Sequence, residues 1–147
     1  MESYPKQKME KSWVRTGITP EIVEWTKSFG KFLSESSSEK KALTTGQLRK
    51  FFGEVRRIDS DIVKHKNDIP MLKPMLAYAV GRDKTTIKGR VVSKSKIQEF
   101  EEELSVALSA IRFNSDEDMK SDFRNFVQIF ESLVAYHKYF GGKDSNN

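Results

Sequence analysis

Several elements of common protein chemistry are missing from this chain of 147 residues, which has no cysteine and only two histidines. The absence of thiols excludes a disulfide framework, a thiolate zinc site and a cysteine nucleophile. The histidines, His65 and His137, are far apart in the sequence and do not have the spacing of metal ligands. We therefore expect no metal and no other cofactor.

Long apolar segments are also absent. A membrane-spanning helix needs a run of about 20 apolar residues, and no such run is present. The N-terminus, MESYPKQKMEK, is polar where a secretion signal would be apolar. These absences predict a cytoplasmic protein that does not use a membrane.

The charge that is present is unevenly distributed. The chain has 26 lysines and arginines against 21 aspartates and glutamates, a formal net charge of +5. The cationic excess lies between residues 49 and 96, whereas the segment from Glu99 to Asp118 is acidic. A concentrated basic region favours an anionic partner. The pattern predicts a basic face and an acidic face on one molecule.

The strongest helical pattern is that of residues 43–66, LTTGQLRKFFGEVRRIDSDIVKHK. Thr44 and Gln47 have the spacing of a capping box, and Leu43 and Leu48 have that of a hydrophobic staple. At about 100° per residue, the segment has one apolar and one cationic face, with Gly53 inside the cationic face. The apolar face comprises Leu48, Phe51, Phe52, Val55, Ile58, Ile62 and Val63. The cationic face comprises Arg49, Lys50, Arg56, Arg57 and Lys64.

Four further segments have helical periodicity. A first helix begins at Thr19 and Pro20, since Thr caps helices and Pro is tolerated at the first position. Residues 71–80 predict a short buried helix that Gly81 ends. A longer helix is expected from residue 92 or 94 to 111, and Ser115 caps a last helix that reaches residue 140. Residues 82–90, RDKTTIKGR, are interpreted as a basic loop.

Together these segments predict an all-α fold, a single-domain bundle of about five helices over residues 18–141. Residues 1–17 are expected to form a flexible N-terminal arm. Its Trp13 is either disordered with the arm or docked on a neighbouring subunit. Residues 142–147 are expected to form a disordered C-terminal tail.

No group of side chains in the sequence predicts catalysis. Glu99, Glu101, Glu102 and Glu103 are adjacent on the fourth helix, where neighbouring carboxylates diverge, so we expect a solvated acidic face rather than an acid–base pair or a metal site. His137 lies on the apolar side of the last helix and is interpreted as a core or groove histidine. The chain is therefore predicted not to be an enzyme.

Three stretches together resemble a known family. They are LTTGQLRKFFGEVRRI at residues 43–58, LKPMLAYAVGR at 72–82 and FRNFVQIFESLVAYHKYFGG at 123–142. In this order and spacing they are similar to the small subunit of type III-A CRISPR effector complexes, the Csm machinery. The resemblance implies a non-catalytic helical subunit, present in several copies, that lines the groove beside the guide-bearing subunits and contacts the target RNA. Residues 1–40 carry no recognised motif.

Candidate RNA-binding residues follow from the resemblance and from charge. The resemblance places RNA contacts at Arg49, Lys50, Arg56 and Arg57 in the first stretch and at Lys73 and Arg82 in the second. Charge alone adds Lys64, Lys84, Lys88 and Arg90. Cations spaced along a surface contact the phosphate backbone without reading sequence. The expected partners are guide and target RNA, other subunits of the CRISPR complex and copies of the chain itself.

A different function class is also compatible with the charge pattern. The basic and acidic faces allow the chain to act as a helical interaction or scaffolding module, which self-stacks or docks on an acidic partner without binding RNA. The sequence leaves open the number of copies and which RNA strand is contacted.

Overall fold

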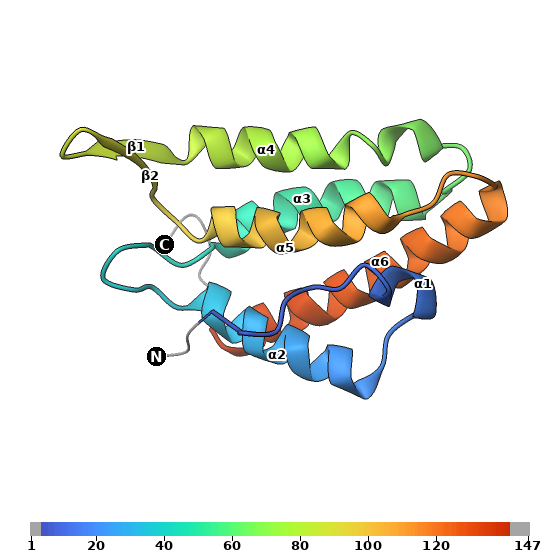
Figure 1. Ribbon diagram of the computed structural model, residues 1–147, viewed down its shortest axis with the longest axis horizontal. Helices are drawn as coiled ribbons and strands as arrows, with labels where there is room; N and C mark the ends of the chain where they lie inside the picture. The colour runs from blue at the N-terminus through green and yellow to red at the C-terminus, as the bar shows by residue number, and fades with distance from the viewer. Residues whose placement is uncertain (1–3, 142–147) are drawn as a thin grey trace.

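The structure is a computed structural model that describes residues 4–141. Over this range it confirms a predominantly α-helical single domain, to which one β-hairpin is added (Figure 1). The elements are α1 (Trp13–Thr16), α2 (Pro20–Ser34), α3 (Thr45–Asp59), the 3-10 helix η1 (Lys66–Asp68), α4 (Leu72–Arg82), β1 (Lys84–Ile87), β2 (Arg90–Ser93), α5 (Ile97–Ala110) and α6 (Asp116–Tyr139).

The predicted helix starts are confirmed at three positions. The Thr19 hydroxyl accepts a hydrogen bond from the amide of Ile22, with Pro20 as the first helical residue. Thr44 and Gln47 form the complete capping box at the start of α3. Ser115 accepts from the third residue of α6 in the same way. Each bond satisfies an amide that has no partner inside the helix.

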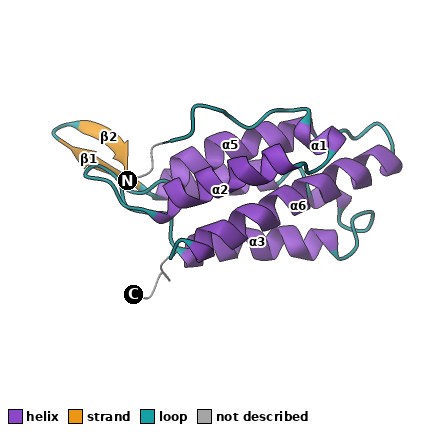
Figure 2. Cartoon of the chain, turned by 90° about the horizontal axis from the view of Figure 1, so that it is seen from below, coloured by secondary structure: helices purple, strands orange, loops and turns teal. Residues whose placement is uncertain are grey.

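The helices pack as a bundle around α6, the longest element. α2 lies along α6, and α1 and α3 also contact it (Figures 1 and 2). α4 lies on α5 at the far edge of the molecule (Figure 1). Three phenyl rings join α3, α5 and α6: Phe130 lies 5.4 Å from Phe51 and 5.8 Å from Phe100 between ring centroids. Among residues 4–141, no helix combines the length and apolarity needed to cross a bilayer.

Residues 4–17 pack against this bundle, whereas the sequence predicted a flexible arm there. Trp13 is buried and meets Trp25 edge-on at 5.2 Å between ring centroids. Glu103, predicted to be solvated, is instead buried: it accepts hydrogen bonds from the Tyr4 hydroxyl at 2.5 Å and from the Met9 amide at 2.7 Å. A buried carboxylate needs such donors. Trp13 therefore belongs to the core of its own chain.

The boundaries of three helices differ from the sequence prediction. α3 ends at Asp59 and not near residue 66, because the Ser60 hydroxyl bonds the carbonyl of Arg57 and a series of turns follows. Gly81 lies inside α4, whose C-cap is Asp83. α5 begins at Ile97, later than expected, because β2 continues to Ser93 and residues 94–96 connect it to the helix. The predicted tail, residues 142–147, lies outside the described residues.

A β-hairpin takes the place of the basic loop predicted for residues 82–90. β1 and β2 pair antiparallel, with Thr85 opposite Val92 and Ile87 opposite Arg90. The two-residue turn uses Lys88 at φ 52° and Gly89 at φ 79°, a left-handed geometry that suits tight hairpins. The hairpin projects beyond the helices at one end of the bundle (Figures 1 and 2).

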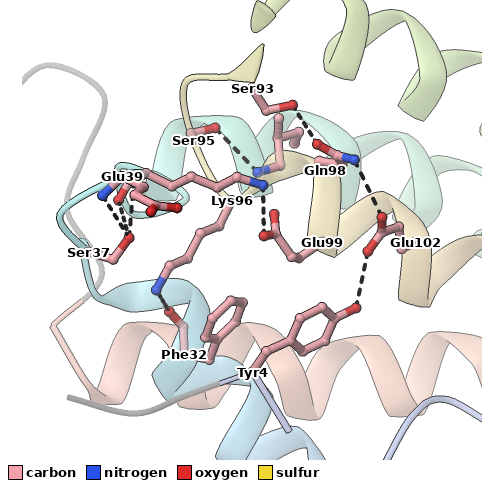
Figure 3. A network of polar contacts seen from close by, with 12 residues as sticks. Tyr4, Phe32, Ser37, Glu39, Ser93, Ser95, Lys96, Gln98, Glu99 and Glu102 are labelled. Atoms are coloured by element: carbon pink, nitrogen blue, oxygen red, sulfur yellow. Dashed lines mark hydrogen bonds and ion pairs between the residues drawn. The ribbon is translucent and has the colours of Figure 1, made fainter. Parts of the chain in front are cut away.

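Polar contacts anchor the base of this hairpin to the bundle. The Asp83 carboxylate accepts from the amide and hydroxyl of Ser95 at 2.8 and 3.0 Å. The buried Lys96 ammonium donates to the carbonyl of Phe32, at the end of α2, at 2.7 Å (Figure 3). Burial lowers the pKa of Lys96. The hairpin therefore projects from a fixed base.

Candidate nucleic-acid interface

The outer face of α3 carries the cations that the sequence predicted there. Arg49, Lys50, Arg56 and Arg57 are all exposed, while the opposite face of α3 is buried. Gly53 lies between them, and a Cβ built at this position meets no atom within 4 Å. The face is therefore open at its centre, where an extended ligand can approach the helix backbone.

Two of these cations lie on the side of α3 that faces α6. Arg49 shares a hollow of about 260 Å³ with Phe52 of α3 and Lys138 of α6. The Arg56 guanidinium stands 5.5 Å from the centroid of the Phe52 ring. Seven residues of α-helix separate Arg49 from Arg56, which corresponds to about 10 Å along the axis.

The other two cations, Lys50 and Arg57, lie on the side of α3 that faces α4, and they differ in their surroundings. Arg57 is paired with Glu54 and donates to Asp68 at 2.8 Å. These hydrogen bonds raise the pKa of Arg57. Within the described residues, Lys50 has no ion-pair partner. Lys50 is therefore the more available of the two for an external anion.

Lys50 shares a cleft with Arg82 of α4, a candidate from a separate stretch of sequence. Both residues line a hollow of about 300 Å³ between α3, α4 and the start of α5, together with Asp83. Asp83 is engaged by Ser95, as described above. Within residues 4–141, Arg82 has no ion-pair partner either, and its guanidinium lies 5.8 Å from the centroid of the Tyr78 ring. Two cations thus converge on one cleft, where an anion can contact both.

The remaining candidates are dispersed over other surfaces. Lys64 lies in the turns after α3 and not on the helix as predicted. Lys73 donates to the hydroxyl of Ser109 on α5 at 2.7 Å, so it faces α5 and not α3. The hairpin carries three exposed candidates at its strands and tip, namely Lys84, Lys88 and Arg90. The ten predicted residues therefore do not form one stripe.

One exposed aromatic residue of this region, Tyr78, was not among the residues predicted from the sequence. Tyr78 is 68% exposed and lines the groove between α3 and α4. The sequence did not predict that Tyr78 is exposed, because it lies in the apolar stretch LKPMLAYAVGR. The packing of α4 on α5 decides which side of this short helix is covered. The helical phase of Tyr78 relative to the buried Leu72 and Leu76 was the available signal.

The acidic side chains at this interface, Glu54, Asp68 and Asp83, accept hydrogen bonds from Arg57 and Ser95. Among the described residues, no group of three or more His, Asp or Glu side chains is placed to hold a metal ion. The buried Asp122 is bound by Arg112 at 3.0 Å. His137 is buried, and its Nε2 lies 2.6 Å from the carbonyl of Leu43, which confirms the interpretation as a core histidine.

Comparison with known proteins places the chain in a family. The family model described as Csm2 Type III-A matches residues 20–143. The chain belongs to the Csm2 family. It is thus a small subunit of the type III-A CRISPR complex, and the other Csm subunits are its partners. The family match begins at the first residue of α2 and leaves out the segment that contains α1. No curated protein and no solved structure matches the chain.

Proposed function

We propose that this Csm2-family chain binds RNA in its CRISPR ribonucleoprotein, lining the groove that holds guide and target RNA. It contacts the backbone without sequence specificity and is itself non-catalytic. The convergence of Lys50 and Arg82 on one cleft carries the proposal, because the two cations come from different elements and have no ion-pair partner among the described residues. Family membership in a CRISPR complex supports an RNA partner.

The physical basis is neutralisation of phosphate charge. Each cation that meets a phosphate releases condensed counterions, and this release drives binding that does not depend on base identity. Arg49 and Arg56 continue the cationic surface on the other side of Gly53, so a strand that enters at the cleft meets further cations across α3. The hairpin, which carries Lys84, Lys88 and Arg90, projects beyond α4 at one end of the bundle (Figure 1) and adds positive charge there.

The test is a charge-matched pair of triple variants. K50A/R56A/R82A removes three cations of the proposed interface, while K27A/K120A/R124A removes three exposed cations from α2 and α6. The first variant is expected to bind single-stranded RNA more weakly. The slope of log affinity against log salt concentration should become shallower by about 2, because each of the three lost phosphate contacts contributes roughly 0.7 to it.

The control triple is expected to keep most of the affinity, since net charge alone changes binding less than loss of contacts. Equal loss in both variants, or none in either, would contradict the assignment of this surface. Incubation of the purified chain with RNA and Mg²⁺ is expected to leave the RNA intact. Cleavage would contradict the non-catalytic role.

A protein-docking role is the second candidate, favoured by exposed side chains with apolar surface on α4 and at its N-cap. Met71 is 60% exposed and Tyr78 is 68% exposed on the same groove. Docking of another subunit, or stacking of a second copy of the chain, would cover them. Such contacts coexist with RNA binding when they use different faces. We place the assembled particle in the cytoplasm, consistent with an RNA partner.

A further inference from the structure

The exposed aromatic ring of Tyr78 stands at the boundary of two hollows in the groove between α3 and α4. One hollow, of about 530 Å³, is lined by Tyr78 together with Met71 and Met75. The other, of about 90 Å³, is lined by Tyr78 with Lys50 and Arg82. The ring therefore borders apolar side chains in both hollows, and the smaller hollow adds the two cations Lys50 and Arg82.

Charge is graded along this groove. At the Met71 end, the cation Arg57 is engaged by Glu54 and Asp68, so this end offers little net attraction to a phosphate. At the opposite end, Lys50 and Arg82 have no ion-pair partner among residues 4–141. Phosphate is therefore attracted to the Lys50 end, and an uncharged planar group fits the Tyr78 and Met71 end.

We propose that this groove is a nucleotide subsite, in which an unpaired base stacks on Tyr78 while its phosphate lies between Lys50 and Arg82. Single-stranded RNA is bound by cations along the backbone and aromatic rings under the bases. Tyr78 supplies the ring, and the Arg82 guanidinium lies over one face of it, 5.8 Å from the centroid, so the base stacks on the other face. Base identity is not read, since every base has a stacking face.

This inference rests on the proposed RNA binding and sharpens it, because stacking requires a base that is free of its partner strand. A purely phosphate-binding surface would hold single and double strands by charge alone. The subsite instead predicts a preference for single-stranded segments. A partner helix in the groove would bury Met71 and Tyr78 but would leave Lys50 and Arg82 without a defined role.

The experiment compares three variants of the full chain by fluorescence anisotropy with a labelled single-stranded RNA and with its duplex. Y78A removes the ring, Y78F keeps it, and Y139A removes another exposed tyrosine, 75% exposed at the end of α6. Within the described residues, the Tyr78 hydroxyl makes no hydrogen bond, so Y78F should bind as the wild type does.

Y78A is expected to lose about tenfold in affinity for the single strand, as alanine substitution at stacking sites does. Its salt slope and its duplex affinity should stay unchanged, and Y139A should bind normally. A 2-aminopurine base in the single strand should report stacking with wild type and Y78F but not with Y78A. Circular dichroism will check that the helices remain, as expected for an exposed position.

The outcomes separate this inference from the function on which it rests. If Y78A binds the single strand as well as wild type while K50A/R56A/R82A does not, the stacking subsite is wrong and RNA binding stands. If neither set of changes weakens binding, both are wrong. If Y78A keeps RNA affinity but fails to assemble with the other Csm subunits, the groove is a protein contact and the subsite is refuted.

Discussion

Alanine at Gly30 and alanine at Gly53 are the same substitution in the interiors of two helices of equal length, yet we expect opposite effects on stability. Gly30 lies in α2 and Gly53 in α3, each a helix of 15 residues. Replacing glycine by alanine inside a helix gains about 1 kcal/mol of helix propensity. Any difference between the two variants therefore comes from what the new methyl group touches.

At Gly30 the methyl group meets α6. A Cβ there would lie 3.0 Å from the backbone nitrogen of His137 and 3.0 Å from Cβ of Tyr136. These atoms belong to a packed helix, so α2 and α6 must separate slightly, and overpacking of this kind costs about 1 to 3 kcal/mol. The shift also strains the hydrogen bond between His137 and the carbonyl of Leu43.

At Gly53 the methyl group meets nothing within 4 Å. We therefore expect G53A to raise the free energy of unfolding by about 1 kcal/mol. G30A should lower it by up to about 2 kcal/mol once propensity is offset against overpacking. The two variants should differ by roughly 1 to 3 kcal/mol.

Urea denaturation followed by circular dichroism measures this difference, provided that the slope of the transition is the same in both variants. G53A should shift the midpoint up and G30A should shift it down. If both midpoints rise together, the close approach of α2 to α6 at Gly30 is wrong. RNA binding by G53A adds a second observation, since a methyl group at the centre of the cationic face should weaken it.

Two further predictions concern buried polar groups. E103L should release the N-terminal segment from the bundle, because the amide of Met9 loses its hydrogen-bond acceptor at a cost of about 1 to 3 kcal/mol. Trypsin should then cleave E103L between residues 4 and 17 faster than it cleaves wild type or E103Q. Unchanged cleavage would show that Glu103 does not hold this segment in place. Burial lowers the pKa of His137 in the folded chain. As the pH falls below about 6.5, the unfolded chain therefore binds a proton at this imidazole more readily than the folded chain, and the free energy of unfolding decreases. In H137Q this part of the pH dependence of the urea midpoint should disappear; an unaltered dependence would contradict it.

The sequence by itself specified where α2, α3 and α6 begin and which family the chain belongs to. The caps at Thr19, Thr44 and Ser115 are bonds to amides within three residues, so the local sequence contains all the information that they need. The cationic face of α3 followed in the same way, because helical spacing alone aligns Arg49 with Arg56 and Lys50 with Arg57, away from the buried Val55.

Tertiary packing decided the features that depend on distant residues. Glu103 is buried because Tyr4 and Met9, far away in the sequence, supply donors for it. The hairpin forms where Asp83 and Ser95 hold its base, although its short strands carry no clear alternation. The convergence of Lys50 with Arg82 required the arrangement of α3, α4 and α5. Local hydrogen bonding and helical periodicity extend over a few residues, whereas charge pairing, burial and the shape of a groove depend on which segments the fold brings together.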